Sequence, residues 1–246
     1  MPASMFTRLA IAAVISAVPF SAEAAPMVSF AGYDWEVRTY GGGPGPNNWD
    51  AGNVFVDSAG LHLKITQASG VWSCAEVIMT GALGFGTYQF EITGRPDRFD
   101  RNVVLGLFNY PASSAIGPDG TNEIDIEFAQ WGDSGNPNRL NWTVHPPVLG
   151  PDPTHHAVPI TPKGDATTHR FDWTPAGVRY DAFRGYQESG NATLLGEWND
   201  APGNPAEQIP QLPLVVHMNL WLFNGQAPAG GQPVEMVIRS FRFTPH

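Results

Sequence analysis

The chain has 246 residues and a formal net charge of -10, and only 15% of its residues are charged. This negative charge argues against nucleic acid or an anionic membrane as the main partner, and we expect neither. The only cysteine is Cys74, so no intramolecular disulfide can form and packing has to stabilise the fold.

The first 24 residues have the pattern of a secretory signal peptide. Arg8 supplies a positive charge, Leu9–Phe20 is an apolar stretch, and Ala22-Glu23-Ala24 is a small-residue cleavage site. We therefore expect cleavage after residue 24 and a protein that is secreted or periplasmic. The apolar stretch is too short to span a bilayer, and no later segment is long enough. Residues 25–246 are predicted to form one domain.

Short strand-like segments recur after this leader, separated by Gly, Pro, Asn and Asp. Polar and apolar residues alternate cleanly in Leu61–Ile65 and Tyr88–Ile92, and no long segment has a helical period. The pattern predicts an all-β sandwich or jelly roll. The predicted strands are Asn53–Val56, Leu61–Thr66, Ala75–Thr80, Gly86–Thr93, Val103–Tyr110, Glu123–Phe128, Arg139–Val144, His169–Thr174, Gly177–Phe183, Leu214–Leu222 and Val234–Phe243.

Four segments rich in Pro, Gly and Asn are expected to be loops: Tyr40–Trp49, Pro111–Asn122, Pro146–Gly164 and Gly196–Pro213. The first of them is expected to wrap over a face or rim. His155 and His156 lie in the third loop, with His145 just upstream. No carboxylate or cysteine spacing completes a zinc site with these histidines, so we predict no metal ligands among them and a loop or rim position instead.

The most unusual segment is Glu123–Phe128, in which acidic and apolar residues alternate. In a strand, this period places Glu123, Asp125 and Glu127 on one face and the apolar residues on the other. Three carboxylates side by side repel one another and would weaken an ordinary surface strand. One use of such a row is glycoside hydrolysis, in which two carboxyl groups flank the scissile bond. A calcium site or a solvated edge strand is the structural alternative.

Distance is the first test of the hydrolase interpretation. Residues four apart on a flat strand have Cα atoms about 13 Å apart, whereas a retaining glycosidase needs its carboxyl groups roughly 5–5.5 Å apart and an inverting one about 6.5–9.5 Å. Glu123 and Glu127 can approach one another by leaning together on a curved sheet, so the retaining distance is reachable but not proved. Asp125 between them would oppose ionisation and help to keep one glutamate protonated.

The run Glu123-Ile-Asp-Ile-Glu127-Phe resembles the E-I-D-I-E-[FM] signature of glycoside hydrolase family 16, the lichenase and laminarinase group. Further stretches are similar to patterns of that family and follow in the family order over Leu61–Phe243. These stretches are Cys74-Ala-Glu76 with Phe85–Glu91, His169–Pro175 and Met218–Trp221.

The resemblance implies a concanavalin A-like jelly-roll sandwich of two antiparallel sheets, with a substrate cleft across the concave sheet. It also implies that Glu123 is the nucleophile and that Glu127 is the general acid and then the base. Asp125 would control protonation, and the configuration of the sugar would be retained.

The resemblance also supplies residues for substrate binding. Trp221, Asn219 and Asn141 are similar to cleft residues of the family, and Glu76 matches a glutamate that binds sugar hydroxyls. His217, beside the Met-Asn-Leu-Trp stretch, is a candidate to face the cleft.

Aromatic faces stack on sugar rings, so Trp131 and Tyr110 are further candidates from their position alone. Core packing is an equal alternative for each tryptophan. It fits Trp142 and Trp173 best, because both alternate with apolar neighbours.

Two departures from the family pattern concern the substrate. The arginine usually found two residues after the glutamate that matches Glu76 is Ile78, and a tryptophan often found before the nucleophile is Thr121. The arginine would have been a bidentate donor to sugar hydroxyls. We keep a β-1,3/1,4-glucan as the default polysaccharide, with galactans or another neutral polysaccharide open.

The leading hypothesis is therefore an exported, retaining endo-β-glycosidase. A non-catalytic, lectin-like jelly roll and a glucan transglycosylase are the alternatives. We expect a monomer that needs no cofactor, and a structural calcium ion is compatible with the resemblance although no motif demonstrates one.

Overall fold

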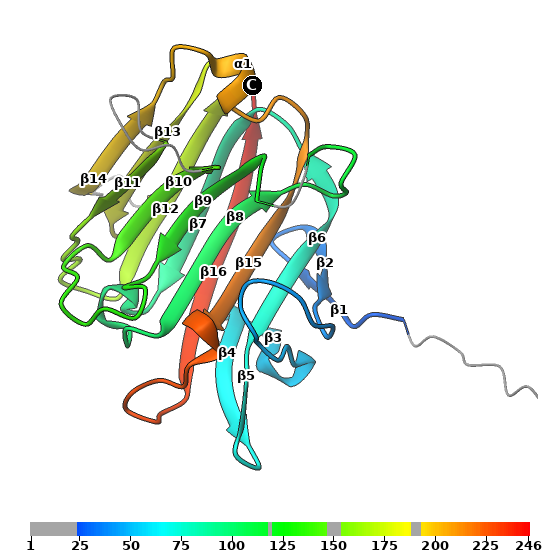
Figure 1. Ribbon diagram of the computed structural model, residues 1–246, viewed down its shortest axis with the longest axis vertical. Coiled ribbons are helices and arrows are strands. Elements are labelled where there is room, and N and C mark those ends of the chain that lie inside the picture. The colour runs from blue at the N-terminus through cyan, green and yellow to red at the C-terminus, as the bar shows by residue number, and fades with distance from the viewer. Residues whose placement is uncertain (1–23, 118–119, 147–153, 188–192) are drawn as a thin grey trace, which may run out of the picture.

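The computed structural model describes residues 24–117, 120–146, 154–187 and 193–246. The predicted signal peptide, residues 1–24, lies outside the described residues except for Ala24. Within the described part, no helix has the length and apolar character needed to cross a membrane. Two antiparallel sheets pack face to face (Figure 1), which confirms the predicted sandwich.

Strands account for nearly all of the regular structure. The short helix α1 (Pro205–Gln208) precedes the penultimate strand, and 3-10 turns occur at Ala51–Asn53, Pro96–Arg98 and Phe223–Gly225. The strands are β1 (Met27–Phe30), β2 (Tyr33–Val37), β3 (Val54–Asp57), β4 (Gly60–Ala68), β5 (Val71–Ser73), β6 (Ala75–Leu83), β7 (Gly86–Thr93), β8 (Val103–Tyr110), β9 (Glu123–Phe128), β10 (Leu140–His145), β11 (His155–Val158), β12 (Ala166–Thr174), β13 (Gly177–Arg184), β14 (Thr193–Asp200), β15 (Leu214–Leu222) and β16 (Val234–Pro245). The first sheet has the order β1-β2-β6-β15-β8-β9-β10-β11. The second has the order β14-β13-β12-β7-β16-β4-β3, with β5 paired to β4.

Every predicted strand overlaps an observed strand, and β7, β8, β9 and β15 have the predicted bounds. The sequence did not reveal β1, β2, β5, β11 and β14. Two expected loops were wrong in part, because β11 lies within the third and β14 extends into the fourth. Both are edge strands whose residues are mostly half-exposed or exposed, so neither needs a continuous apolar face that a sequence pattern could reveal.

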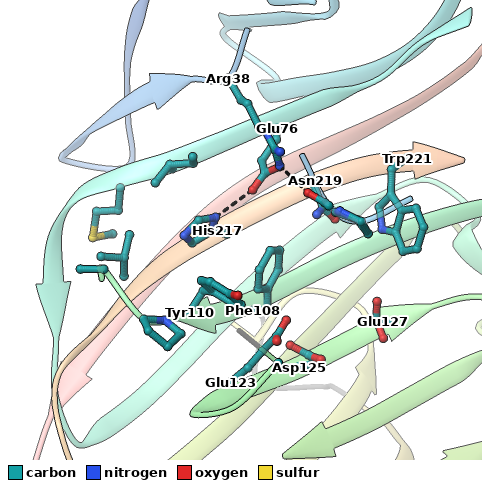
Figure 2. Close-up of a pocket in the computed structure, with 18 of the residues that line it drawn as sticks. Arg38, Glu76, Phe108, Tyr110, Glu123, Asp125, Glu127, His217, Asn219 and Trp221 are labelled. Atoms are coloured by element: carbon teal, nitrogen blue, oxygen red, sulfur yellow. Dashed lines mark hydrogen bonds and ion pairs between the residues drawn. The ribbon is translucent and has the colours of Figure 1, made fainter. Parts of the chain in front are cut away.

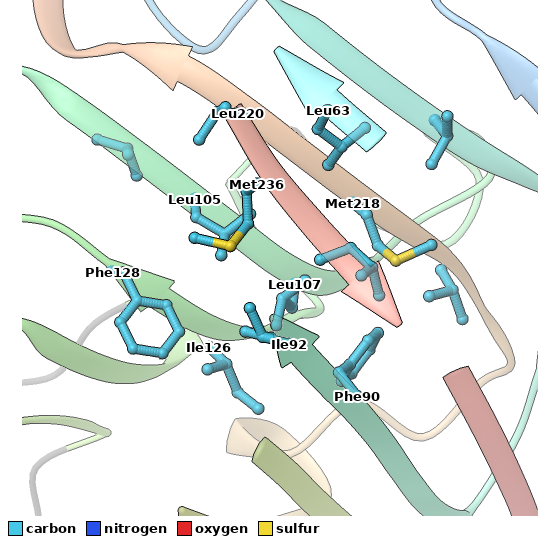
Figure 3. Packing of buried hydrophobic residues seen from close by; sticks show 14 of the residues in the cluster. Leu63, Phe90, Ile92, Leu105, Leu107, Ile126, Phe128, Met218, Leu220 and Met236 are labelled. Atoms are coloured by element: carbon cyan, nitrogen blue, oxygen red, sulfur yellow. The ribbon is translucent and has the colours of Figure 1, made fainter. Parts of the chain in front are cut away.

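The core lies between the sheets and is built from alternate residues of the facing strands. Ile124, Ile126 and Phe128 on β9 are fully buried there, on the opposite face from the acidic row. Side chains from the two sheets meet in Figure 3, with Leu63, Phe90, Ile92 and Met236 from the second sheet and Leu105, Leu107, Ile126, Phe128, Met218 and Leu220 from the first. The core therefore holds β8, β9 and β15 in place beneath their outward-facing residues.

Trp142 and Trp173 are both fully buried, as their apolar neighbours indicated. The Nε1 atom of Trp173 donates a hydrogen bond to the carbonyl oxygen of Pro210 at 2.9 Å. The ring of Trp142 stacks on Tyr180 with ring centroids 5.8 Å apart. These two tryptophans thus belong to the core and not to a binding surface.

Truncation of the core beneath the acidic strand should destabilise the fold. We expect Leu107→Ala to lower the free energy of unfolding by about 2–5 kcal/mol, since it leaves a cavity beside β9. The matched variant Leu212→Ala, at a residue that is 53% exposed, should change it by no more than about 0.5 kcal/mol. Chemical denaturation of both variants measures the difference, and equal losses would contradict this packing.

Candidate active site

A cleft of about 620 Å³ lies on the outer face of the first sheet. Side chains of β6, β15, β8 and β9 form its floor. Tyr40, Gly43 and Pro44 line its rim, so the predicted loop Tyr40–Trp49 is present and reaches the cleft. Pro111, at the start of the second predicted loop, also lines the cleft.

The register of the sheet sets the outward side chains in rows that cross the strands. One row runs through Glu76, Asn219, Gly106, Glu127 and Asn141, the next through Ile78, His217, Phe108, Asp125 and Thr143, and the last ends with the cross-strand pair Glu123 and His145. Residues far apart in the sequence therefore become neighbours within the cleft.

The three acidic residues of β9 all line the cleft and point into it from one strand (Figure 2). Asp125, in the middle, is only 3% exposed. Burial raises the pKa of its carboxyl group well above its usual value, although a hydrogen bond with Glu123 opposes the shift.

The pKa of Glu127 is also raised well above its usual value. Burial is the main cause, and the negative charges of Asp125 and Glu123 add to it, whereas His145 acts in the opposite direction. A carboxyl group with a raised pKa keeps its proton at a higher pH, which is what a general acid near neutral pH requires. Glu127 thus has the electrostatic setting of a proton donor.

The loop or rim position predicted for His145 was wrong, because His145 belongs to a strand of the first sheet and contacts the acidic row. It ends β10, opposite Glu123 on β9, and its Nε2 atom lies 2.7 Å from Oδ2 of Asp125. The alternation of Asn141, Thr143 and His145 places these three side chains on one face. Only the pairing of β10 with β9 shows that this face belongs to the acidic row.

Among the described residues, Glu123, Asp125 and His145 form a group whose potential metal-ligand atoms lie within 4.8 Å of one another. The spacing of residues along the sequence did not reveal these carboxylates as neighbours of His145, because they come from the adjacent strand. Calcium takes six to eight oxygen ligands, so this set, which includes an imidazole nitrogen, does not fit a structural calcium ion. The expected absence of a metal stays a prediction.

Asn219 and Trp221, two of the predicted binding residues, line the cleft from β15. Oδ1 of Asn219 accepts a hydrogen bond from the backbone N–H of Gly106 at 3.1 Å. A Cβ atom at Gly106 would lie 2.5 Å from that oxygen, so only glycine leaves Asn219 in this position. In this row, the position between Asn219 and Glu127 therefore carries no side chain.

Tyr110 lines the cleft as predicted, but Asn141 and Trp131 do not. Asn141 is buried, and its Oδ1 accepts a hydrogen bond from Nε1 of Trp131 at 3.2 Å. Its Nδ2 donates to the carbonyl oxygen of Ala129 at 3.3 Å. The Trp131 ring lies 6.4 Å from that of Trp221. Asn141 and Trp131 therefore lie behind the part of the cleft that Trp221 lines and do not form the cleft surface.

Glu76 lines the cleft with both of its carboxylate oxygens engaged (Figure 2). Arg38 Nη1 donates to Oε2 at 2.6 Å, and Nδ1 of His217 lies 2.8 Å from Oε1. His217 faces the cleft, as its place beside Met-Asn-Leu-Trp indicated. Arg38 was missed because it follows β2, a strand that the sequence did not reveal.

No family model and no curated protein matches the sequence, but solved structures match the fold. A β-glucanase from Bacillus licheniformis is 22% identical with a TM-score of 0.61, covering 86% of this chain and 92% of that chain. A glycoside hydrolase family 16 endo-glucanase from Bacteroides ovatus is 14% identical with a TM-score of 0.62, covering 85% and 94%. Rv0315 of Mycobacterium tuberculosis, described as a pseudo β-1,3-glucanase, is 21% identical with a TM-score of 0.62, covering 86% and 91%.

The fold and its cleft thus define a jelly-roll sandwich with an acidic groove across one sheet. More particularly, the chain has the fold of glycoside hydrolase family 16, as the Glu123–Phe128 run suggested.

Proposed function

We propose that the protein is a retaining endo-β-glycosidase that hydrolyses a neutral polysaccharide by double displacement. A β-1,3/1,4-glucan is the default substrate. The observation that carries the proposal is the row of three carboxyl groups on the cleft floor, with a raised pKa at Glu127. A retaining glycosidase needs a carboxylate nucleophile and a protonated acid on either side of the scissile bond.

In the first step, a carboxylate oxygen of Glu123 bonds to the anomeric carbon while the glycosidic bond breaks. Glu127 transfers its proton to the leaving oxygen, so that the leaving chain departs as an alcohol. In the second step, Glu127 removes a proton from water, which attacks the anomeric carbon and releases Glu123 as a carboxylate. Asp125, which contacts His145, lies between the two glutamates, and its negative charge helps to raise the pKa of Glu127.

Export is part of the proposal and rests on the signal-peptide pattern of residues 1–24. The glucan substrate is supported by structural neighbours, one of which is a Bacteroides ovatus mixed-linkage glucan enzyme in complex with a G4G4G3G product. Its chain is 15% identical to this one, with a TM-score of 0.59.

Two alternatives are each favoured by one neighbour. The pseudo-glucanase description of Rv0315 favours a protein that binds glycans without cleaving them. The structure of the transglycosylase Crh5 in complex with NAG, 15% identical with a TM-score of 0.54, favours transfer of the sugar to another chain. Products longer than the input glycan identify transfer, and glycan binding without any product identifies a binding protein.

The direct test of the function is reducing-end release by residues 25–246 on lichenan, laminarin, xyloglucan, agarose and carrageenan, beside the Glu123→Gln variant. Reducing-end release from a neutral polysaccharide by the wild type, but not by Glu123→Gln, establishes the hydrolase and its substrate class. If a folded protein releases no reducing ends from any of the five polysaccharides, hydrolysis of these glycans is refuted.

The proposed role of Asp125 predicts a change in the pH profile. In Asp125→Asn, the pKa of Glu127 should fall, because one of the negative charges that raise it is removed. Glu127 then loses its proton at a lower pH, so the alkaline limb of kcat/KM should move to lower pH. Asp165→Asn, at an exposed aspartate away from the cleft, serves as the control. An alkaline limb that stays in place in Asp125→Asn contradicts the assignment of Glu127 as the acid.

A further inference from the structure

The end of the cleft beside Glu76 differs from what the resemblance implies. Glu76 was expected to bind sugar hydroxyls, yet its side chain is only 3% exposed and both of its oxygens already have protein partners. Arg38 donates to one oxygen, and the imidazole of His217 contacts the other. These partners use two of the roughly four acceptor positions of the carboxylate, and its burial leaves little of it for a sugar hydroxyl to reach.

The contact with Glu76 fixes the tautomer of His217. A carboxylate only accepts hydrogen bonds, so Nδ1 of His217 has to carry the proton that is donated to Oε1 of Glu76. In the neutral imidazole, the other nitrogen, Nε2, is then a hydrogen-bond acceptor. No protein partner for Nε2 is found within the described residues, and His217 lines the cleft.

The surroundings of His217 are mostly apolar. Its ring lies 4.9 Å from that of Phe108 and 5.8 Å from that of Tyr110, and its cross-strand neighbour is Ile78. Phe108 and Ile78 both line the cleft (Figure 2 labels Phe108 between His217 and Asp125). His217, Phe108 and Ile78 thus form one wall of the cleft, in which an acceptor nitrogen lies among aromatic and aliphatic side chains. Such a surface matches a sugar ring, which has hydroxyl groups at its edge and C–H groups on its face.

The cationic charge next to this wall is already engaged. Arg38 is 7% exposed, and its guanidinium donates to Glu76 and to the carbonyl oxygens of Tyr40 and Gly43. It also lies over the ring of Trp49, 4.4 Å from the centroid. Because Arg38 and Glu76 neutralise one another, a sulfated or carboxylated sugar would find no free arginine or lysine among the described residues that line this end of the cleft.

We propose that His217, and not Glu76, is the specificity-determining residue at this end of the cleft. Nε2 of His217 accepts a hydrogen bond from a hydroxyl group of an uncharged sugar unit, and the face of that sugar ring packs on Phe108. Arg38 and Glu76 are positioning residues, since they orient the imidazole and fix its tautomer. The inference deepens the proposed function, on which it rests for the nature of the ligand as a neutral polysaccharide.

The test is titration of neutral polysaccharides into Glu123→Gln protein that also carries His217→Phe or His217→Gln. The phenyl ring keeps the contact with Phe108 but has no acceptor, so affinity should fall at least tenfold, or about 1.4 kcal/mol. Glutamine has an N–H donor for Glu76 and an oxygen acceptor for the sugar, so it should restore most of the affinity. His246→Phe, at the residue that follows β16 of the second sheet, is the matched control. Unchanged affinity in His217→Phe, or equal losses in both His217 variants, overturns the proposal.

Kinetics with the active enzyme give an independent readout. His217→Phe should raise KM by a larger factor than it lowers kcat, because the contact lies away from the reacting atoms. A fall in kcat alone would overturn the proposal.

The binding test separates this inference from the proposed function. Titration does not need turnover, so a protein that cleaves nothing but binds a neutral glycan through His217 refutes the hydrolase and upholds the inference. Conversely, tighter binding of carrageenan than of every neutral polysaccharide refutes the inference, whether or not the protein is a hydrolase.

Discussion

Turnover of polysaccharide by the Glu123→Gln variant is expected to fall by at least about a thousandfold, the scale of loss when a catalytic group is removed. Glutamine has nearly the shape of glutamate but cannot form the covalent ester with the sugar. Glu123 lies at the cleft surface of β9, outside the core, so the fold should be retained. Glycan affinity should also be retained, since the groups proposed to bind sugar lie on β8 and β15.

Initial rates of reducing-end release, with thermal unfolding and glycan titration on the same preparations, measure this prediction. Glu207→Gln, at an exposed glutamate on α1, is the matched control and should behave as the wild type. Hydrolysis by Glu123→Gln at the wild-type rate would be incompatible with the proposed nucleophile.

The second large effect is expected from Glu127→Gln, and its size should depend on the leaving group. Loss of general acid catalysis should reduce polysaccharide hydrolysis by about a hundredfold to ten-thousandfold. A dinitrophenyl glycoside of the same sugar has a leaving group that departs without protonation, so formation of the glycosyl-enzyme should be much less affected. The second step then lacks its base and becomes slow.

Pre-steady-state release of dinitrophenol distinguishes these steps, because a rapid burst should precede slow turnover in Glu127→Gln. The same variant should lose the alkaline limb of the pH profile that we assign to Glu127. If the dinitrophenyl substrate and the polysaccharide lose rate by the same factor, Glu127 is not the acid.

The sequence predicted the part of the site that lies on a single strand. Alternation along Glu123–Phe128 was sufficient to place the three acids on one face and Ile124, Ile126 and Phe128 in the core. It was sufficient because a strand has a fixed period of two and its core face is strongly apolar. The same reasoning gave β7, β8 and β15, which supply the floor of the cleft and the core beneath it.

The parts that the sequence did not reveal depend on pairing between strands. His145 reaches Asp125 only because β10 is in register with β9, and Arg38 reaches Glu76 only because β2 pairs with β6. Neither register can be read from a local pattern, since both depend on the folded sheet.

The role of Glu76 illustrates a further limit of sequence reasoning. A matching residue type predicts that a carboxylate is present at the cleft, but not whether its oxygens are already occupied. That depends on His217 and Arg38, which are brought to Glu76 from β15 and from the end of β2. Our proposal for the substrate preference at this end of the cleft therefore rests on the contacts of Glu76 and not on its residue type.

The central claim is that Glu123 forms a covalent bond with the sugar, and trapping this intermediate tests it most directly. The enzyme would be incubated with a 2-deoxy-2-fluoro dinitrophenyl glycoside of the polysaccharide that it cleaves, digested with trypsin and analysed by tandem mass spectrometry. Trypsin should release residues 102–139, a peptide that contains all three acids of β9. The account predicts one glycosyl group on this peptide, attached to Glu123. Attachment to Asp125 or Glu127, or inactivation without any adduct, would contradict it.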